Sequence, residues 1–159
     1  MVASEHERYM TMAIEEAKAG AAGGDQPFGA VVVLNGEVVC RSRSLKVSTS
    51  DTTAHSETLA IKYATQKLKR RFIPEAVFYS TCEPCPMCMG AVFNSGIKTL
   101  VLGARNADVA RLANHAFNFK DYRAETFAEF VGWDLTLVTG ILHEQCIDLY
   151  RSAKIELTR

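Results

Sequence analysis

The sequence lacks three features that would direct it to a polyanion, a membrane or the secretory route. Lys plus Arg and Asp plus Glu both number 18, so the formal net charge is zero and offers no global attraction for nucleic acid or an anionic membrane. No apolar run approaches the ~20 residues that span a bilayer, so no membrane partner is expected. The N-terminal segment is amphipathic and acidic, unlike a secretory signal, and we therefore expect a cytoplasmic protein.

The remaining composition is that of an ordinary globular protein. The 159 residues are 48% hydrophobic and 23% charged, which predicts one domain over residues 1–159. Five cysteines is an odd number, and without a secretory signal a disulfide framework is not expected. Clustered cysteines in such a protein indicate metal or redox chemistry instead.

Hydrophobic periodicity predicts strands alternating with helices. Strands are expected at 28–34, 37–41, 76–81, 98–104 and 134–139, the first two joined by the hairpin signal Asn35-Gly36. Helices are expected near the N-terminus, from about His55 after an N-cap at Thr52 or Thr53, from 86 to a stop at Gly96, and near the C-terminus. This order predicts an α/β protein, a three-layer α/β/α sandwich around a five-stranded mixed sheet. Residues 105–133 have no clear pattern.

Two cysteines stand where a helix should begin. Pro86 between Cys85 and Cys88 favours the first helical position, and residues three apart there share a face. The positive end of the helix dipole favours thiolates, which are metal ligands. Two thiolates and one imidazole form a three-ligand Zn²⁺ site that keeps its fourth position open, as catalytic zinc sites do.

His55 is the best candidate for the imidazole. It opens a predicted helix, and Glu57 follows two residues later. At a helix start both side chains can face one cleft, whereas in mid-helix they would diverge. We therefore predict His55, Cys85 and Cys88 as zinc ligands and Glu57 as the catalytic proton carrier.

These residues resemble a known family. His55-x-Glu57 and "PCPMC" match the H-x-E…P-C-x-x-C signature of the zinc-dependent cytidine deaminase-like superfamily. "QPFGAVVV", "TAHSETLAI", "STCEPCPMCMGA" and "LVTGILHEQC" are similar to segments of guanine deaminases, tRNA adenosine deaminases and related nucleoside deaminases. The resemblance covers roughly residues 5–150. It implies hydrolytic removal of a ring amino group as ammonia, a small-molecule substrate and a homodimer.

The sequence departs from this family at the positions that would contact the base. Ser56 stands between the histidine and glutamate, where Ala or Val is usual, and Ser44 replaces an asparagine that hydrogen-bonds the base in purine-acting members. An aspartate pair of guanine deaminases is replaced by Asn114, His115 and Ala116. The substrate-binding candidates are Phe28, Ser44, Ala54, Glu83, Asn114 and His115.

Several residues allow a second interpretation. Cys82, Cys85 and Cys88 resemble part of an iron–sulfur motif, although the fourth cysteine expected nearby is missing. Phe28 could equally be a core residue, Glu83 could orient a loop, and Asn114 and His115 could be an exposed loop pair. The cations of "KLKRR" at 67–71 could contact RNA or could simply end a helix.

The resulting hypothesis is a zinc-dependent deaminase of a small amino-substituted base or nucleoside. Guanine or a related aminopurine ranks first, and an amino-pyrimidine or triazine-like ring is possible. The alternatives are a tRNA adenosine deaminase, against which the zero net charge argues, and a non-catalytic zinc-stabilised binding module.

Overall fold

The protein folds around a five-stranded mixed sheet with the strand order β2-β1-β3-β4-β5. The computed structural model describes residues 3–112, 117–151 and 153. The strands are β1 (Gly29–Leu34), β2 (Glu37–Arg43), β3 (Val77–Cys82), β4 (Thr99–Ala104) and β5 (Thr136–Val138). β1 pairs antiparallel with β2 and β3, whereas β3, β4 and β5 are parallel. The β1–β2 turn has Asn35 and Gly36 at φ 53° and 78°, the positive values that a two-residue hairpin turn of this kind requires.

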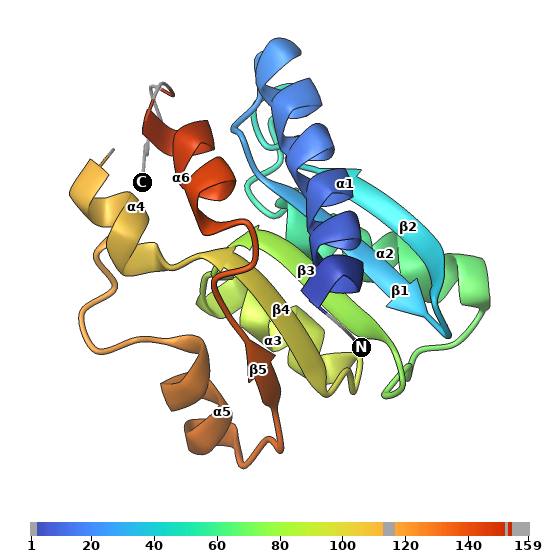
Figure 1. The fold of residues 1–159 in the computed structure, drawn as a ribbon. Coiled ribbons are helices and arrows are strands. Elements are labelled where there is room, and N and C mark those ends of the chain that lie inside the picture. Colours follow the sequence, from blue (N-terminus) through green and yellow to red (C-terminus); the bar gives the residue numbers. More distant parts are fainter. Residues whose placement is uncertain (1–2, 113–116, 152, 154–159) are drawn as a thin grey trace.

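Helices cover both faces of the sheet (Figure 1). Helices α1 (Ala3–Ala22) and α6 (His143–Arg151) pack on one face, against β1, β2, β3 and β4. Helices α2 (Ser56–Leu68) and α3 (Pro86–Asn94) pack together beneath the other face. Of two short helices, α4 (Asn106–Leu112) follows the end of β4 and contacts α6, and α5 (Ala124–Val131) contacts α3.

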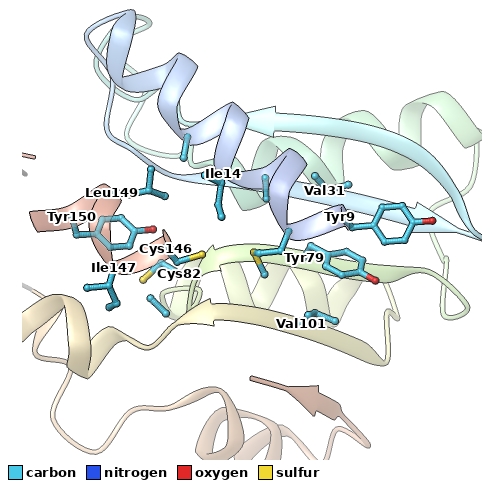
Figure 2. Close-up of a cluster of buried hydrophobic side chains, with 14 of the residues drawn as sticks. Tyr9, Ile14, Val31, Tyr79, Cys82, Val101, Cys146, Ile147, Leu149 and Tyr150 are labelled. Atoms are coloured by element: carbon cyan, nitrogen blue, oxygen red, sulfur yellow. The ribbon is translucent and has the colours of Figure 1, made fainter. Parts of the chain in front are cut away.

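Each face of the sheet has its own hydrophobic core. Figure 2 shows the core between α1, α6 and the sheet, where Tyr9, Tyr79 and Tyr150 are fully buried. Helix α1 passes so close to β1 that a Cβ on Gly29 would lie 1.9 Å from the carbonyl oxygen of Ala13. The opposite core is centred on Phe78, Met89 and Leu100. The side chains of β3 and β4 alternate between the two cores, as expected for strands buried on both faces.

The predicted three-layer α/β/α fold is confirmed, and three local details differ. Residues 105–133 contain α4 and α5, which the sequence pattern did not predict. The expected strand at 134–139 is reduced to Thr136–Val138. Neither Thr52 nor Thr53 caps α2, because the N-cap is His55. The Asp51 carboxylate accepts the Thr53 N–H at 2.8 Å, which turns the chain before the helix starts.

Within the described ranges, no helix has both the length and the apolar character needed to cross a bilayer.

Candidate active site

The site forms where the N-termini of α2 and α3 meet. His55 and Cys85 are the N-cap residues of these helices, with extended backbone angles of φ −72°, ψ 154° and φ −66°, ψ 169°. Neither side chain caps its own helix. Pro86 occupies the first turn of α3, as its fixed φ favours. Both side chains are therefore available for contact with each other, 30 residues apart in the chain.

His55, Cys85 and Cys88 place three metal-binding atoms within 4.8 Å of one another. His55 Nδ1 lies 3.8 Å from Cys85 Sγ and 3.4 Å from Cys88 Sγ, and the two sulfurs are 3.6 Å apart. In a tetrahedral zinc site, Zn–S bonds are about 2.3 Å and Zn–N bonds about 2.0–2.1 Å long. Two ligand atoms bound to the same ion therefore lie roughly 3.6–3.8 Å apart. The donor set and its spacing thus fit a zinc ion with one remaining position.

The two thiols of the cluster differ in how readily they ionise. The hydrogen bond with Cys88, assisted by His55, lowers the pKa of Cys85 to about 4 although burial opposes this. The same hydrogen bond, together with burial, raises the pKa of Cys88. The hydrogen bond with Cys85 raises the pKa of His55. The cluster therefore stabilises a thiolate at Cys85, and thiolates are the metal-binding form of cysteine.

Glu57 lies beside this cluster and is 5% exposed. Its Oε2 is 3.7 Å from Cys88 Sγ. Burial raises the pKa of the Glu57 carboxyl, an effect that the nearby His55 partly offsets. A raised pKa makes this carboxylate a stronger proton acceptor than an exposed glutamate, which suits a proton-transfer catalyst.

One serine holds this carboxylate and a second lies near it. Ser56 Oγ donates to Glu57 Oε2 at 3.0 Å, whereas Ser80 Oγ donates to the Cys82 carbonyl oxygen at 2.7 Å and lies 3.4 Å from Glu57 Oε1. Ser56 is fully buried, and Ser80 comes from β3, 23 residues away. Ser56 was visible in the sequence as a departure from the family motif, but only the fold shows what its hydroxyl contacts.

A cavity of about 70 Å³ opens onto these groups. The predicted residues that line it are His55, Glu57, Cys85, Phe28, Ser44 and Glu83. The other described residues that line it are Gln26, Lys46, Ser56, Asn106, Phe117 and Phe119. The Phe28 ring also packs against Phe117 and Tyr150, with centroids 5.7 and 5.3 Å apart, so it belongs to both the cavity wall and an aromatic cluster.

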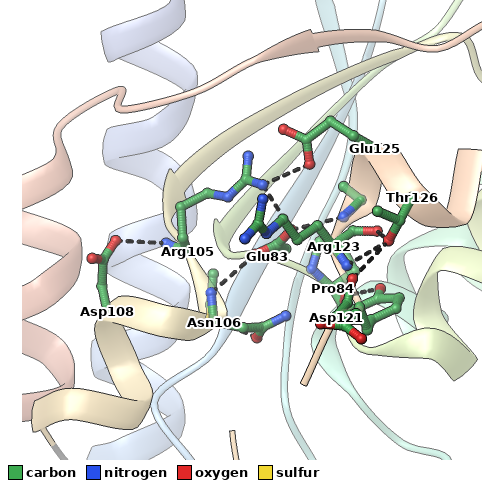
Figure 3. Close-up of polar contacts among 12 residues, drawn as sticks. Glu83, Pro84, Arg105, Asn106, Asp108, Asp121, Arg123, Glu125 and Thr126 are labelled. Carbon is green, nitrogen blue, oxygen red and sulfur yellow. Dashed lines mark hydrogen bonds and ion pairs between the residues drawn. The ribbon is translucent and has the colours of Figure 1, made fainter. Parts of the chain in front are cut away.

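Glu83 lines the cavity and also accepts hydrogen bonds from the first residues of two helices (Figure 3). It is 4% exposed, and its carboxylate accepts the backbone N–H groups of Asn106 at 3.0 Å and Ala124 at 2.8 Å, the first residues of α4 and α5. Arg105 forms an ion pair with it at 3.1 Å. A carboxylate is favourable at a helix N-terminus, and here a single one serves two helices. Glu83 therefore lines the cavity and also orients the neighbouring loops.

The other three predicted substrate-binding residues are not found among the described residues that line the cavity. Ala54 is buried but does not line the cavity, and its carbonyl oxygen accepts the Leu45 N–H at 3.0 Å. Its role in substrate binding stays a prediction. Asn114 and His115 lie outside the described residues.

Cys82 does not belong to the His55–Cys85–Cys88 cluster; its thiol points toward Asn106 Oδ1 at 3.7 Å.

Comparisons with known proteins indicate the same family of deaminases as the H-x-E…P-C-x-x-C motif. Residues 4–136 match the family described as MafB19-like deaminase. The chain is 35% identical over 143 residues to a tRNA-specific adenosine deaminase of Bacillus subtilis, covering 90% of this chain and 84% of that protein. It is 34% identical over 115 residues to a guanine deaminase of the same organism, covering 72% of each.

Solved structures of deaminases also superpose on this chain. A guanine deaminase from Nitrosomonas europaea superposes with a TM-score of 0.78 at 28% identity, covering 91% of this chain and 82% of that one. A structure from a study of A-to-I editing by tRNA:A34 deaminases superposes with a TM-score of 0.73 at 26% identity, covering 89% and 98%. The expected cytidine deaminase-like fold is confirmed. This chain therefore belongs to the MafB19-like deaminase family, enzymes that hydrolyse C–N bonds.

Proposed function

We propose that this protein is a zinc-dependent hydrolytic deaminase of a small amino-substituted nucleobase or nucleoside. The observation that supports it most is the position of Glu57, whose carboxylate lies 3.7 Å from Cys88 Sγ in the cavity that His55 and Cys85 also line. A binding module would have no need to bury a carboxylate with a raised pKa beside its metal ligands.

His55 Nδ1, Cys85 Sγ and Cys88 Sγ would hold the zinc ion. A zinc ion in such a site lowers the pKa of water toward ~7 and stabilises negative charge on oxygen. Glu57 takes a proton from the attacking water and delivers it to the ring or to the leaving nitrogen. A C–O bond forms at the amino-bearing ring carbon, the C–N bond breaks, and ammonia leaves with the transferred protons.

Ser56 is a positioning residue in this scheme, because its hydroxyl fixes one oxygen of Glu57. The variant Ser56→Ala is expected to lower kcat by about tenfold with little change in KM, since loss of one hydrogen bond misdirects the carboxylate without removing it. Steady-state kinetics on zinc-loaded protein, with zinc content measured in parallel, provide the test. An unchanged kcat would contradict the positioning role.

Guanine or a related aminopurine remains the substrate class that the sequence ranks first. The identities to the adenosine and guanine deaminases, 35% and 34%, are too similar to rank their substrates for this chain. An ammonia-release screen on zinc-loaded protein over guanine, guanosine, cytosine, adenine, isoguanine and aminotriazines is expected to give at least one product. A screen in which no ring is deaminated would contradict a small-molecule substrate.

A tRNA adenosine deaminase is the second candidate, supported by the relatives of that name. The zero net charge is unfavourable for it, because affinity for RNA depends mainly on cations that contact phosphates. We expect neither inosine formation in tRNA nor salt-dependent tRNA binding.

The homodimer that the resemblance implies would have twice the chain mass of 17.5 kDa, which light scattering can measure. A cytoplasmic location likewise stays a prediction of the sequence.

A further inference from the structure

The ammonium group of Lys46 is a charge in the cavity wall that the protein does not neutralise. Lys46 is partly buried and lines the same cavity as His55 and Glu57. Within residues 3–112, 117–151 and 153, its side-chain nitrogen makes no hydrogen bond or ion pair. Water can solvate such a charge, but a ligand that enters the cavity displaces part of this water. A bound ligand therefore has to supply a partner for the ammonium or lose affinity.

The backbone that carries this charge is held in place. The Lys46 N–H faces Ser44 Oγ at 3.5 Å, and the Lys46 carbonyl oxygen accepts the Asp51 N–H at 3.2 Å. The Asp25 carboxylate accepts the N–H of the next residue, Val47, at 2.9 Å. These bonds fix where the lysine stem leaves the loop, and only the side-chain nitrogen is left without such a contact.

The charge of Lys46 acts on the predicted metal ligands. The hydrogen bond with Cys85 raises the pKa of His55, whereas burial and the Lys46 ammonium oppose that rise. The ammonium is therefore close enough to His55 to disfavour its protonated form. Since Lys46, His55 and Glu57 line one cavity, a ring that reaches Glu57 can also place a substituent beside the ammonium.

Neither carboxylate of the cavity wall compensates this charge. Glu57 accepts the Ser56 hydroxyl, and in the proposed function it exchanges protons with water and substrate. Glu83 pairs with Arg105 at 3.1 Å and accepts two backbone N–H groups. Among the described residues that line the cavity, Lys46 is the one lysine or arginine, and no negative side chain is in contact with it.

We propose that Lys46 determines specificity by binding an anionic substituent, a carboxylate or a phosphate, on the amino-substituted ring or its sugar. The inference rests on the proposed function and names its substrate class as small amino-heterocycles that carry negative charge. A hydrogen bond between an ammonium and an anion is roughly twice as strong as one between neutral groups, so a neutral ring of the same shape would bind less tightly. One lysine suits one anionic group, and the formal net charge of zero disfavours a polyanion as its source.

The test compares ligands that differ in the anionic group. The pairs are cytosine with 5-carboxycytosine, and adenosine and guanosine with their 5′-monophosphates, so that a ring carboxylate is distinguished from a sugar phosphate. Binding is measured by titration calorimetry on the zinc-loaded full chain carrying Glu57→Gln, which prevents consumption of the ligands. We expect the charged member of at least one pair to bind about tenfold more tightly than the neutral member. This advantage should shrink as the salt concentration rises.

Variants at Lys46 then assign the advantage to its charge. Lys46→Gln keeps a polar side chain but removes the charge, so the two members of the pair should bind equally. Lys46→Arg keeps the charge and should retain most of the advantage. Lys62→Gln is the matched control, because Lys62 is an exposed lysine of α2 that does not line the cavity. Its replacement should leave the advantage unchanged.

The possible outcomes separate the two proposals. An advantage that persists in Lys46→Gln would place the anion on the metal or elsewhere and would overturn the role of Lys46. Equal affinity for charged and neutral ligands in the protein with Lys46 intact, or binding of none of them, would overturn it as well. If the advantage depends on Lys46 but zinc-loaded protein with Glu57 intact releases no ammonia from any ring, the proposed function fails while the recognition role stands. If neutral rings are deaminated and Lys46→Gln changes neither binding nor turnover, the function stands and the recognition role fails.

Discussion

Glutamine in place of Glu57 is expected to reduce deamination by about 10²–10⁴-fold while the protein keeps its zinc. The amide cannot take up a proton from water or return it to the leaving nitrogen. It can still accept the Ser56 hydroxyl, which lies 3.0 Å from Glu57 Oε2, so the local structure should persist. The measurement is kcat/KM for a ring that the ammonia screen identifies, with metal content determined on the same samples.

The matched control is Glu75→Gln. Glu75 is exposed and pairs with Arg70 at 2.7 Å, away from the cavity, so its replacement should leave turnover unchanged. A Glu57→Gln protein that turns over the substrate at the parental rate would refute the mechanism. If no substrate is found and the variant also binds zinc normally, the binding-module alternative gains support.

Removal of the metal is expected to have the second large effect. Cys88→Ala deletes a fully buried sulfur that lies 3.4 Å from His55 Nδ1 and 3.6 Å from Cys85 Sγ. We expect loss of zinc, loss of turnover and a lower Tm. A metal present at about 100 times its Kd adds about 2.7 kcal/mol to the free energy of unfolding. For a chain of this length that corresponds to a Tm shift of roughly 5–10 °C.

A chelator separates the metal effect from simple loss of packing. It should lower the Tm of the parent protein but not that of Cys88→Ala, because the variant has no metal to lose. The control is Cys40→Ala, since Cys40 is outside the cluster and its thiol contacts the Ala60 carbonyl oxygen at 3.2 Å. Cys40→Ala should keep its zinc and respond to the chelator as the parent does. Unchanged zinc content in Cys88→Ala would contradict the assigned ligand set.

Much of the site is encoded in short segments of sequence. Pro86 after Cys85 signals a helix start, and the three-residue spacing to Cys88 places both sulfurs on one side of it. His55 and Glu57 face one cleft because α2 begins between them, at Ser56. The Asn35-Gly36 turn and the alternation of apolar strands with helices were enough to predict the three-layer fold. All of these depend on backbone preferences and on neighbours within a few residues.

The remaining features depend on contacts between distant segments. The first backbone N–H groups of α4 and α5 donate to Glu83, which lies 23 and 41 residues earlier in the chain. Local caps are also present, because Asp108 Oδ2 and Thr126 Oγ1 accept the N–H groups of Arg105 and Arg123 at 3.3 and 2.9 Å, but the shared carboxylate that joins the two helix starts cannot be predicted from neighbouring residues. In the same way, Asn106 enters the cavity wall because of its contacts with Glu83 and Cys82. The sequence by itself determined the pattern of candidate metal ligands, the carboxylate predicted to lie beside them and the layered fold, because each follows from local geometry. Only the tertiary structure decided which polar groups line the cavity, because burial and hydrogen-bond partners are set by residues far apart in the chain.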